Sequence, residues 1–292
     1  MSYFSRKFIL LIIVFSLSVI PAFSQQPNYE KGVQLYNQKQ YNEAIKVFKQ
    51  ATKHKETKED SRIWNHLGLS YIQISDTKNA RKALETAVKL DSQSVAYKAN
   101  LAYVYLVEGE FNKALSESED AIKLNPQDIN ANYFRGLSYF AKGQTEQAIS
   151  DAEKTTTINP AFTNGYILKA DSLVQIFSLD WSKDINSEER LITLKQAIDT
   201  LNECLEKCET SDQSLVQNKL ESINSLYKTF NKKDKDESPI SDKTEVENKQ
   251  DKTEAVNKQE ATGMKILTKP VPGYTNLARS SGTQGEILLA IS

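Results

Sequence analysis

The chain has 292 residues, of which 39% are hydrophobic, and its formal net charge is −1. A chain this close to neutral has no overall field that would attract nucleic acid or an anionic membrane, which argues against functions that depend on such a field. The hydrophobic fraction is low for one compact domain. Such a fraction is typical of a thin stack of helices that is joined to a disordered segment without a hydrophobic core.

The first 24 residues have the organisation of a secretory signal peptide. Arg6 and Lys7 form a short positive region, an apolar run extends from Phe8 to Ile20, and small residues precede a cleavage site after Ser24. The apolar run is shorter than the roughly 20 residues that span a bilayer. It therefore favours cleavage over the alternative of a retained membrane anchor. We expect export, to the periplasm or cell envelope if the source is a Gram-negative bacterium.

A period of 34 residues runs through the middle of the chain. Tyr71, Tyr105 and Tyr139 are spaced by it (105 − 71 = 139 − 105 = 34). The same spacing recurs in Ala80, Ala114 and Ala148, and in Pro126 and Pro160. A fixed period of this length predicts stacked helical hairpins, each one burying its apolar face against the next. Such a stack offers an extended binding surface rather than a catalytic pocket.

The clearest unit extends from Ser61 to Ser94. Its first half reads Trp64-x2-Leu67-Gly68-x2-Tyr71, and Ala80, Leu84 and Ala87 follow on its second half. This pattern resembles the tetratricopeptide repeat. The resemblance implies an all-α solenoid of helical hairpins over residues 25–230, with small residues such as Gly68 and Ala80 where helices cross. Two further regular units, 95–128 and 129–162, have Gly109 and Gly143 at the turn, where a left-handed backbone is expected.

The remaining units are less regular. An earlier unit begins near Gln25 or Pro27. In the fifth unit about 15 residues are inserted between Leu173 and Arg190, and the insert contains Phe177, Leu179 and Trp181. We favour packing of these aromatic residues on the stack over a projecting binding loop. Residues 211–230 are expected to form a capping helix over the last apolar surface.

The resemblance also implies where a partner would bind, because first helices line the concave face in this family. It places nine residues in that groove: Asn65, Leu69, Gln73, Ala99, Tyr103, Val107, Tyr133, Leu137 and Ala141. None of the nine is charged, so we predict an apolar helix or extended segment of a partner protein, and no clamp for a C-terminal carboxylate. The alternative is that Tyr103 and Tyr133 pack between repeats.

Catalytic and metal-binding signals are not found in the sequence. It has no nucleophile motif and no glycine-rich phosphate loop, so we predict a protein that is not an enzyme and uses no cofactor, metal or small-molecule substrate. Cys204 and Cys208 lie four residues apart on one expected helix, where bridge geometry is poor. We interpret them as small apolar residues of a buried stripe, against the alternatives of a redox pair or a metal site.

The chain changes character after residue 230. Residues 231–262 are rich in Lys, Asp and Glu and predict a disordered charged linker. Residues 263–292 resemble the beginning of the TonB C-terminal domain. The matching positions are Pro270, Pro272, Tyr274, Ala278, Arg279 and Gly285. The resemblance implies a short partial α+β segment, which covers only part of that domain.

Two functions follow from these observations. The first is an exported scaffold or adaptor of the bacterial cell envelope, which binds a partner segment in the concave groove. The second is a component of a TonB-type energy-transduction system for outer-membrane transport. The sequence names no partner, although envelope or outer-membrane transport proteins would suit either role.

Overall fold

The computed structural model describes residues 27–55, 57–179 and 187–236. Over these residues the protein consists of helices joined by short turns, and none of the described residues lies in a strand. The α-helices are α2 (Pro27–Asn37), α3 (Tyr41–Ala51), α4 (Ser61–Gln73), α5 (Thr77–Leu90), α6 (Val95–Val107), α7 (Phe111–Leu124), α8 (Ile129–Ala141), α9 (Thr145–Ile158), α10 (Thr163–Leu179), α11 (Ser187–Lys207) and α12 (Gln213–Asp236).

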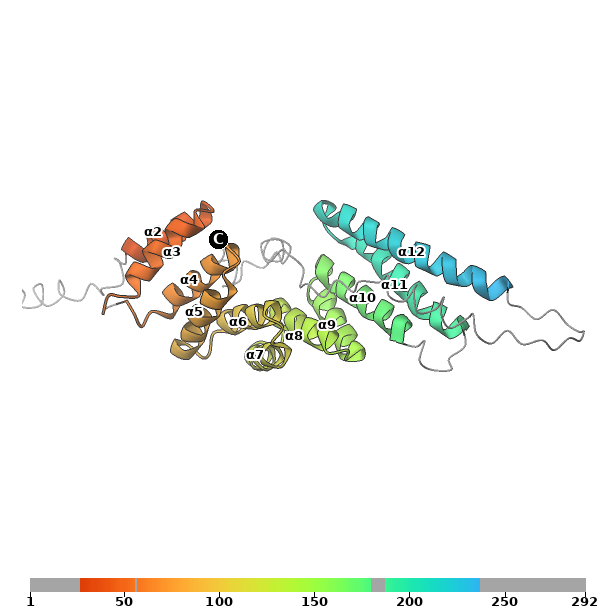
Figure 1. The fold of residues 1–292 in the computed structure, drawn as a ribbon, viewed down its shortest axis with the longest axis horizontal. Coiled ribbons are helices and arrows are strands. Elements are labelled where there is room, and N and C mark those ends of the chain that lie inside the picture. The colour runs from red at the N-terminus through yellow and green to blue at the C-terminus, as the bar shows by residue number, and fades with distance from the viewer. Residues whose placement is uncertain (1–26, 56, 180–186, 237–292) are drawn as a thin grey trace, which may run out of the picture.

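Five antiparallel hairpins follow one another along the long axis of the molecule (Figure 1). They are α2–α3, α4–α5, α6–α7, α8–α9 and α10–α11, and each one packs against the next. This arrangement confirms the expected all-α solenoid. None of the helices in the described part of the chain has the length and apolar character of a membrane span. The expected signal peptide and TonB-like segment lie outside the described residues, as does the expected linker from residue 237 onward.

Local sequence signals decide where the helices begin and end. Asp60, Asp76 and Asp128 precede α4, α5 and α8, and each carboxylate accepts a hydrogen bond from a backbone N–H in the first turn. Such caps satisfy donors that have no partner within the helix. Helix α7 ends at Leu124, because Asn125 precedes Pro126 and is extended, with φ −140° and ψ 98°.

Small residues set the distance between the two helices of a hairpin. Ala80, Ala114 and Ala148 are completely buried, as the period predicts. A Cβ atom added to Gly68 would lie 2.6 Å from Leu84 Cγ, which is closer than side-chain atoms pack. The sequence therefore sets the close packing of the two helices through small residues at the positions where they meet.

In each of the first four hairpins, one residue of the turn has a left-handed backbone conformation. Gly109 and Gly143 have φ of 77° and 72°, which confirms the prediction for these glycines. Lys39 and Ser75 occupy the equivalent position in the first two hairpins, and both have φ of 61°. A side chain in this conformation costs about 1–2 kcal/mol. The first two hairpins therefore carry backbone strain that the next two avoid.

Replacing Ser75 with glycine should consequently stabilise the protein by roughly 1 kcal/mol, after allowance for the greater freedom of glycine in the unfolded chain. Urea denaturation of the S75G variant measures this gain. Gly109→Ser is the matched control and should lose a similar amount, because a Cβ at Gly109 would meet nothing within 4 Å and only the backbone is affected. Equal stability of S75G and the wild type would contradict the prediction.

The fifth hairpin absorbs its insertion by lengthening both helices. Helix α10 has 17 residues and α11 has 21, whereas α8 and α9 have 13 and 14. Phe177 lies near the end of α10, is 3% exposed, and has its ring 5.2 Å from the ring of Phe230 in α12. Packing is thus confirmed for Phe177. Trp181 and the side chain of Leu179 are not described.

Helix α12 occupies the position of a further first helix. Residues of α12 and of the turn just before it contact α10 in ascending order, so the two helices are parallel: Asp212 accepts from Thr163, Lys219 pairs with Asp171, and Phe230 meets Phe177. Its other face bears exposed polar residues such as Gln217, Glu221 and Ser225. The expected cap is therefore present, and it is built as half of a sixth hairpin.

The end of α12 corrects the expected boundary of the linker. The helix continues to Asp236, so residues 231–236 are not linker as predicted. Composition alone marked this stretch as disordered. The lysines there are good helix formers, and a helix already anchored by tertiary contacts can extend through them.

The cysteine pair corrects a second expectation. Cys204 and Cys208 are both buried on the apolar stripe, as interpreted, but they are joined by a disulfide. The sequence argument assumed one regular helix, whereas α11 ends at Lys207 and Cys208 already lies beyond it. The Cα atoms are 5.1 Å apart, within the range that a disulfide bridges.

Candidate protein-binding surface

The nine residues predicted for the groove lie on α4, α6 and α8, at equivalent positions of three successive first helices. Four are buried: Asn65, Leu69, Ala99 and Tyr133. Gln73, Tyr103 and Leu137 are half-buried, and Val107 and Ala141 are exposed. The structure thus places five of the nine where a partner could contact them. We call these five residues the first-helix face.

Tyr133 belongs to the core rather than to this face. It is 3% exposed, and its ring meets that of Phe162 edge-on at 5.4 Å. Burial raises the pKa of Tyr133 well above its usual value, and the nearby carboxylate of Asp171 raises it further. For this residue, the prediction of a groove contact is wrong and the alternative of packing between repeats is confirmed.

Asn65 is held inside the stack by a polar contact that the sequence did not reveal. Its Oδ1 accepts a hydrogen bond of 2.9 Å from Nδ2 of Asn100 in the next hairpin. Both side chains are completely buried. The pair joins α4 to α6, so Asn65 positions two first helices and is not available to a partner. Only the 35-residue separation of two asparagines could have suggested it, and that is a weak signal.

The first-helix face that remains is uncharged and partly apolar. Tyr103 lies in its middle, with its ring 5.7 Å from the buried ring of Phe134. Burial raises the pKa of Tyr103, so its hydroxyl stays protonated at neutral pH and can donate a hydrogen bond. Arg62, on the same helix as Gln73, is already bound to Asp60, with Nη2 and Oδ2 2.7 Å apart.

An aromatic cluster packs the stack at its N-terminal end. His66 is 4% exposed and lies among the rings of Tyr29, Tyr36 and Phe48, at 5.4, 6.3 and 5.7 Å. Burial raises the pKa of Tyr29 to about 12. Over the described residues, no group of three or more His, Cys, Asp or Glu side chains could hold a metal ion.

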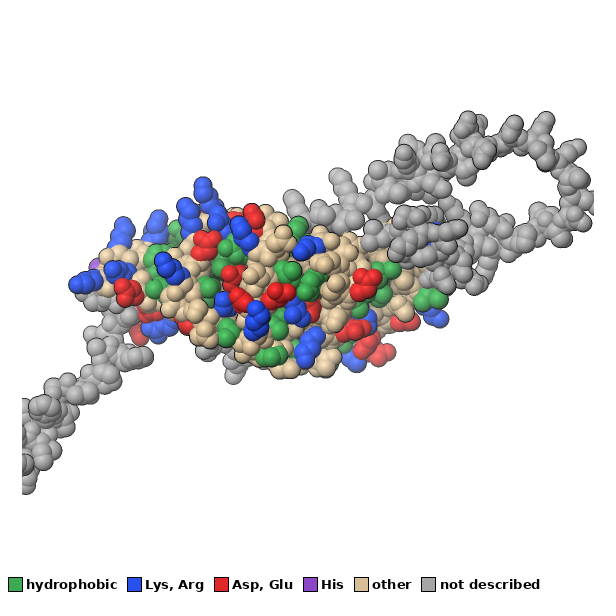
Figure 2. Space-filling view, turned by 90° about the horizontal axis from the view of Figure 1, so that it is seen from below, with side chains coloured by type: hydrophobic (Ala, Val, Ile, Leu, Met, Phe, Trp, Pro, Cys, Tyr) green, Lys and Arg blue, Asp and Glu red, His purple; other side chains and the backbone are tan. Residues whose placement is uncertain are grey.

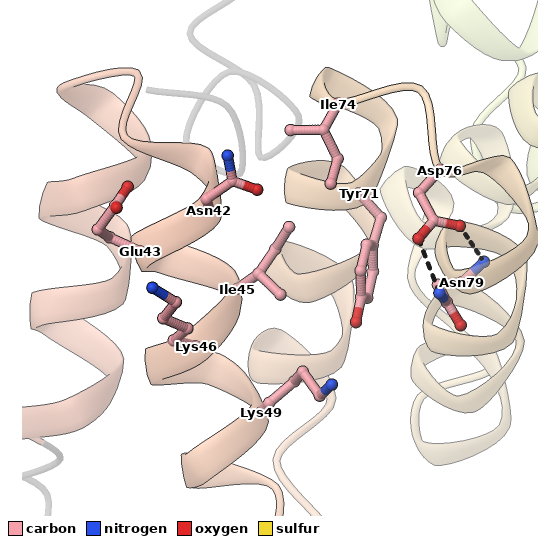
Figure 3. Close-up of a pocket in the computed structure, with 9 residues that line it drawn as sticks. All are labelled: Asn42, Glu43, Ile45, Lys46, Lys49, Tyr71, Ile74, Asp76 and Asn79. Atoms are coloured by element: carbon pink, nitrogen blue, oxygen red, sulfur yellow. Dashed lines mark hydrogen bonds between the residues drawn. The ribbon is translucent and has the colours of Figure 1, made fainter.

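A shallow hollow between the first two hairpins was not predicted (Figure 3). Helix α3 forms one wall, and the end of α4 with the beginning of α5 forms the other. Its lining consists of Asn42, Glu43, Ile45, Lys46, Lys49, Tyr71, Ile74, Asp76 and Asn79. Ile74, just after α4, is 38% exposed, so its side chain gives the hollow part of its apolar surface.

The architecture defines a class of protein, the solenoid of helical hairpins. Residues 29–95 and 99–161 match the family model of the tetratricopeptide repeat. Over these residues the chain is similar to the tetratricopeptide repeat, in agreement with the resemblance drawn from the sequence pattern.

Solved structures have the same fold. A crystal structure of MamA protein is 23% identical, covers 62% of this chain and 89% of its own, and has a TM-score of 0.51. TTC0263, a thermophilic TPR protein in Thermus thermophilus, is 20% identical, covers 68% of this chain and 97% of its own, and has a TM-score of 0.50. At these identities the likeness shows the fold alone. No curated protein matches the sequence.

The residues of the TonB-like motif, Pro270 to Gly285, lie outside the described part of the chain. The comparisons do not support that resemblance.

Proposed function

We propose that this protein is an exported scaffold of the bacterial cell envelope that binds a segment of a partner protein on its first-helix face. The tetratricopeptide-repeat fold supports a role in protein binding. The observation that carries the proposal is the line of uncharged, accessible side chains on successive first helices: Gln73, then Tyr103 and Val107, then Leu137 and Ala141. Repeated positions of this kind fit the regularly spaced side chains of a helix or extended segment.

The envelope location rests on the sequence, in the charged start, apolar run and small residues that precede Gln25. Expression of the full chain in a Gram-negative host, followed by fractionation and N-terminal sequencing, tests it. A soluble periplasmic product beginning at Gln25 is expected. A chain retained in the cytoplasm with Met1 or Ser2 as its first residue would contradict export and leave the binding face untouched.

The binding face is tested by placing a photo-crosslinking amino acid at Val107. This side chain is 36% exposed on the face, and Leu124, 39% exposed on a second helix, is the matched control position. Irradiation in cells should give a discrete adduct from position 107 and a weaker one or none from position 124. Equal adducts from both positions would contradict a specific face.

Removing the Tyr103 side chain should reduce the adduct from position 107 by about tenfold, because buried aromatic anchors dominate interface energies. The control is Tyr139→Ala, which removes another half-buried tyrosine from the same type of helix but outside the face. Thermal unfolding of both variants establishes that the fold is intact. An unchanged adduct with Y103A, or an equal loss with Y139A, would exclude Tyr103 as a contact.

The sequence also suggested TonB-type energy transduction. It is no part of the proposal, because the comparisons do not support the TonB resemblance.

A further inference from the structure

The second helices present a row of outward positions whose charge changes along the stack. In the first hairpin these positions hold Asn42, Lys46, Lys49 and Lys53; in the second, Lys78, Lys82, Glu85 and Lys89; in the third, Asn112, Ser116, Glu119 and Lys123; in the fourth, Glu146, Ser150, Glu153 and Thr157. The first two hairpins thus have six lysines here and the next two have one. We call these six the outer lysines.

The outer lysines are not neutralised by the fold. All six are exposed, and none of them forms an ion pair within the described part of the chain. Lysines further along are paired, for example Lys98 with Glu117 at 3.7 Å and Lys123 with Asp120 at 2.8 Å. Lysine and arginine side chains accordingly gather at the end of the molecule formed by α2–α5 (Figure 2).

At these outward positions of the first two hairpins there is one acid, Glu85, and its carboxylate is already engaged. Its Oε1 accepts hydrogen bonds from Arg81 at 3.2 Å and from the Tyr105 hydroxyl at 3.0 Å. It is therefore not free to balance the outer lysines, and their positive charge faces solvent.

The hollow between the first two hairpins lies beside this charge. Lys46 and Lys49 line one wall, and Tyr71 and Ile74 lie across from them (Figure 3). Ile45 forms the floor and is 8% exposed. On the α5 side, both carboxylate oxygens of Asp76 accept hydrogen bonds from Asn79, at 3.2 and 2.7 Å. Glu43 also lines the hollow, beside Lys46 on α3. The hollow thus combines an apolar floor with a rim that carries Lys46 and Lys49 together with Glu43, while Asp76 is engaged by Asn79.

We propose that this lysine-rimmed hollow binds an acidic segment of a partner protein. One apolar side chain of that segment enters between Ile45 and Ile74, and flanking carboxylates face Lys46 and Lys49. The site is separate from the first-helix face, so it goes beyond the function proposed above. Charge complementarity defines the partner, because unpaired lysines favour carboxylates at the rim and the apolar floor demands a side chain without charge.

Two other anionic surfaces fit less well. A membrane surface binds proteins through apolar side chains that protrude into it, whereas the apolar atoms here lie in a hollow. Single-stranded nucleic acid is held by stacking on accessible aromatic rings, and the one aromatic residue of the hollow, Tyr71, is half-buried.

The test uses the full chain and a short fluorescein-labelled peptide that has acidic residues around one phenylalanine. Fluorescence anisotropy should show saturable binding that weakens as salt rises from about 0.01 M to 0.1 M, because the Debye length falls from about 30 to about 10 Å. A peptide with serine in place of phenylalanine should bind at least about tenfold more weakly.

Two variants divide the site into its parts. K46S/K49S removes the rim and I74S removes the apolar wall, and each should weaken peptide binding by about tenfold. These side chains are exposed, so folding should be unaffected, and circular dichroism establishes this. The control is K123S, which removes an exposed lysine from the third hairpin and should change affinity by less than about twofold, an order-of-magnitude expectation for a distant charge.

Three results of the peptide measurements would overturn the proposal. They are no saturable binding of the peptide, equal binding of the peptide without phenylalanine, and a loss in K123S as large as that in K46S/K49S. Tighter binding of phosphatidylserine vesicles or of single-stranded DNA than of the peptide, unaffected by I74S, would also overturn it and identify a general basic surface instead.

Discussion

Replacing Phe134 with alanine will lower the free energy of unfolding by about 3–5 kcal/mol. Phe134 is 1% exposed, and its ring lies 5.7 Å from that of Tyr103 and 5.8 Å from that of Tyr133. The deletion removes apolar contacts on both sides of the ring. In a stack where each hairpin contacts only its neighbours, a cavity at this position weakens the junction between the third and fourth hairpins.

Urea denaturation monitored by circular dichroism measures the loss for F134A. The control is Phe111→Ala, which deletes the same atoms from a half-buried site in the same core. Its loss should be about half as large, because less apolar area is removed from the interior. If F134A were no less stable than F111A, the ring would not have the structural role that its burial indicates.

Replacing Asp151 with alanine should cost about 3 kcal/mol, the lower end of the range for breaking a buried ion pair. Asp151 is 3% exposed, and its Oδ2 and Oδ1 accept hydrogen bonds of 2.9 and 2.6 Å from Nε and Nη2 of Arg135. This pairing raises the pKa of Arg135. The D151A variant leaves the guanidinium group without its partner, although its 26% exposure lets water reach it and limits the loss.

The second hairpin supplies the control for this prediction. Its residues at the equivalent positions are Leu67 and Ala83, both buried. The double variant R135L/D151A therefore introduces into the fourth hairpin the leucine and alanine that the second hairpin has at these positions. It should recover most of the stability lost in D151A. A double variant as unstable as D151A in urea denaturation would show that the ion pair is required, not merely costly to break.

The hairpins could be predicted from the sequence because their determinants are local. Tyr71, Ala80 and Gly109 repeat with their neighbours at one fixed period, and each of them is placed by steric demands within its own hairpin. The lengthened fifth hairpin was located for the same reason, as the place where the period fails. The end of α12 was missed, since it depends on contacts made elsewhere in the helix.

The candidate surface was predicted less well, and burial explains the difference. The repeat register placed Tyr133 and Tyr103 on the same face of their helices, one turn apart. Yet Tyr133 belongs to the core, whereas Tyr103 is accessible. What decides this is the neighbouring hairpin, because Phe162 covers Tyr133. A single sequence specifies which face a residue is on, but not what the next repeat lays over it.

The hollow escaped prediction for a related reason. Its lining comes from α3 of the first hairpin and from α4 and α5 of the second, and no pattern within one hairpin describes a gap between two. The ion pair of Arg135 and Asp151 was missed as well. These residues are 16 apart, and they occupy positions that are apolar in the second hairpin.

The position of α12 as half a hairpin has a consequence for how the stack is attached to its surroundings. Successive helices alternate in direction, so a complete set of hairpins would return the chain to the edge from which it started. In the described part of the chain, an unpaired final helix brings it out at the other edge. Pro27 and Asp236 therefore lie at opposite ends of the stack (Figure 1). A pull between them would be transmitted through every hairpin in turn.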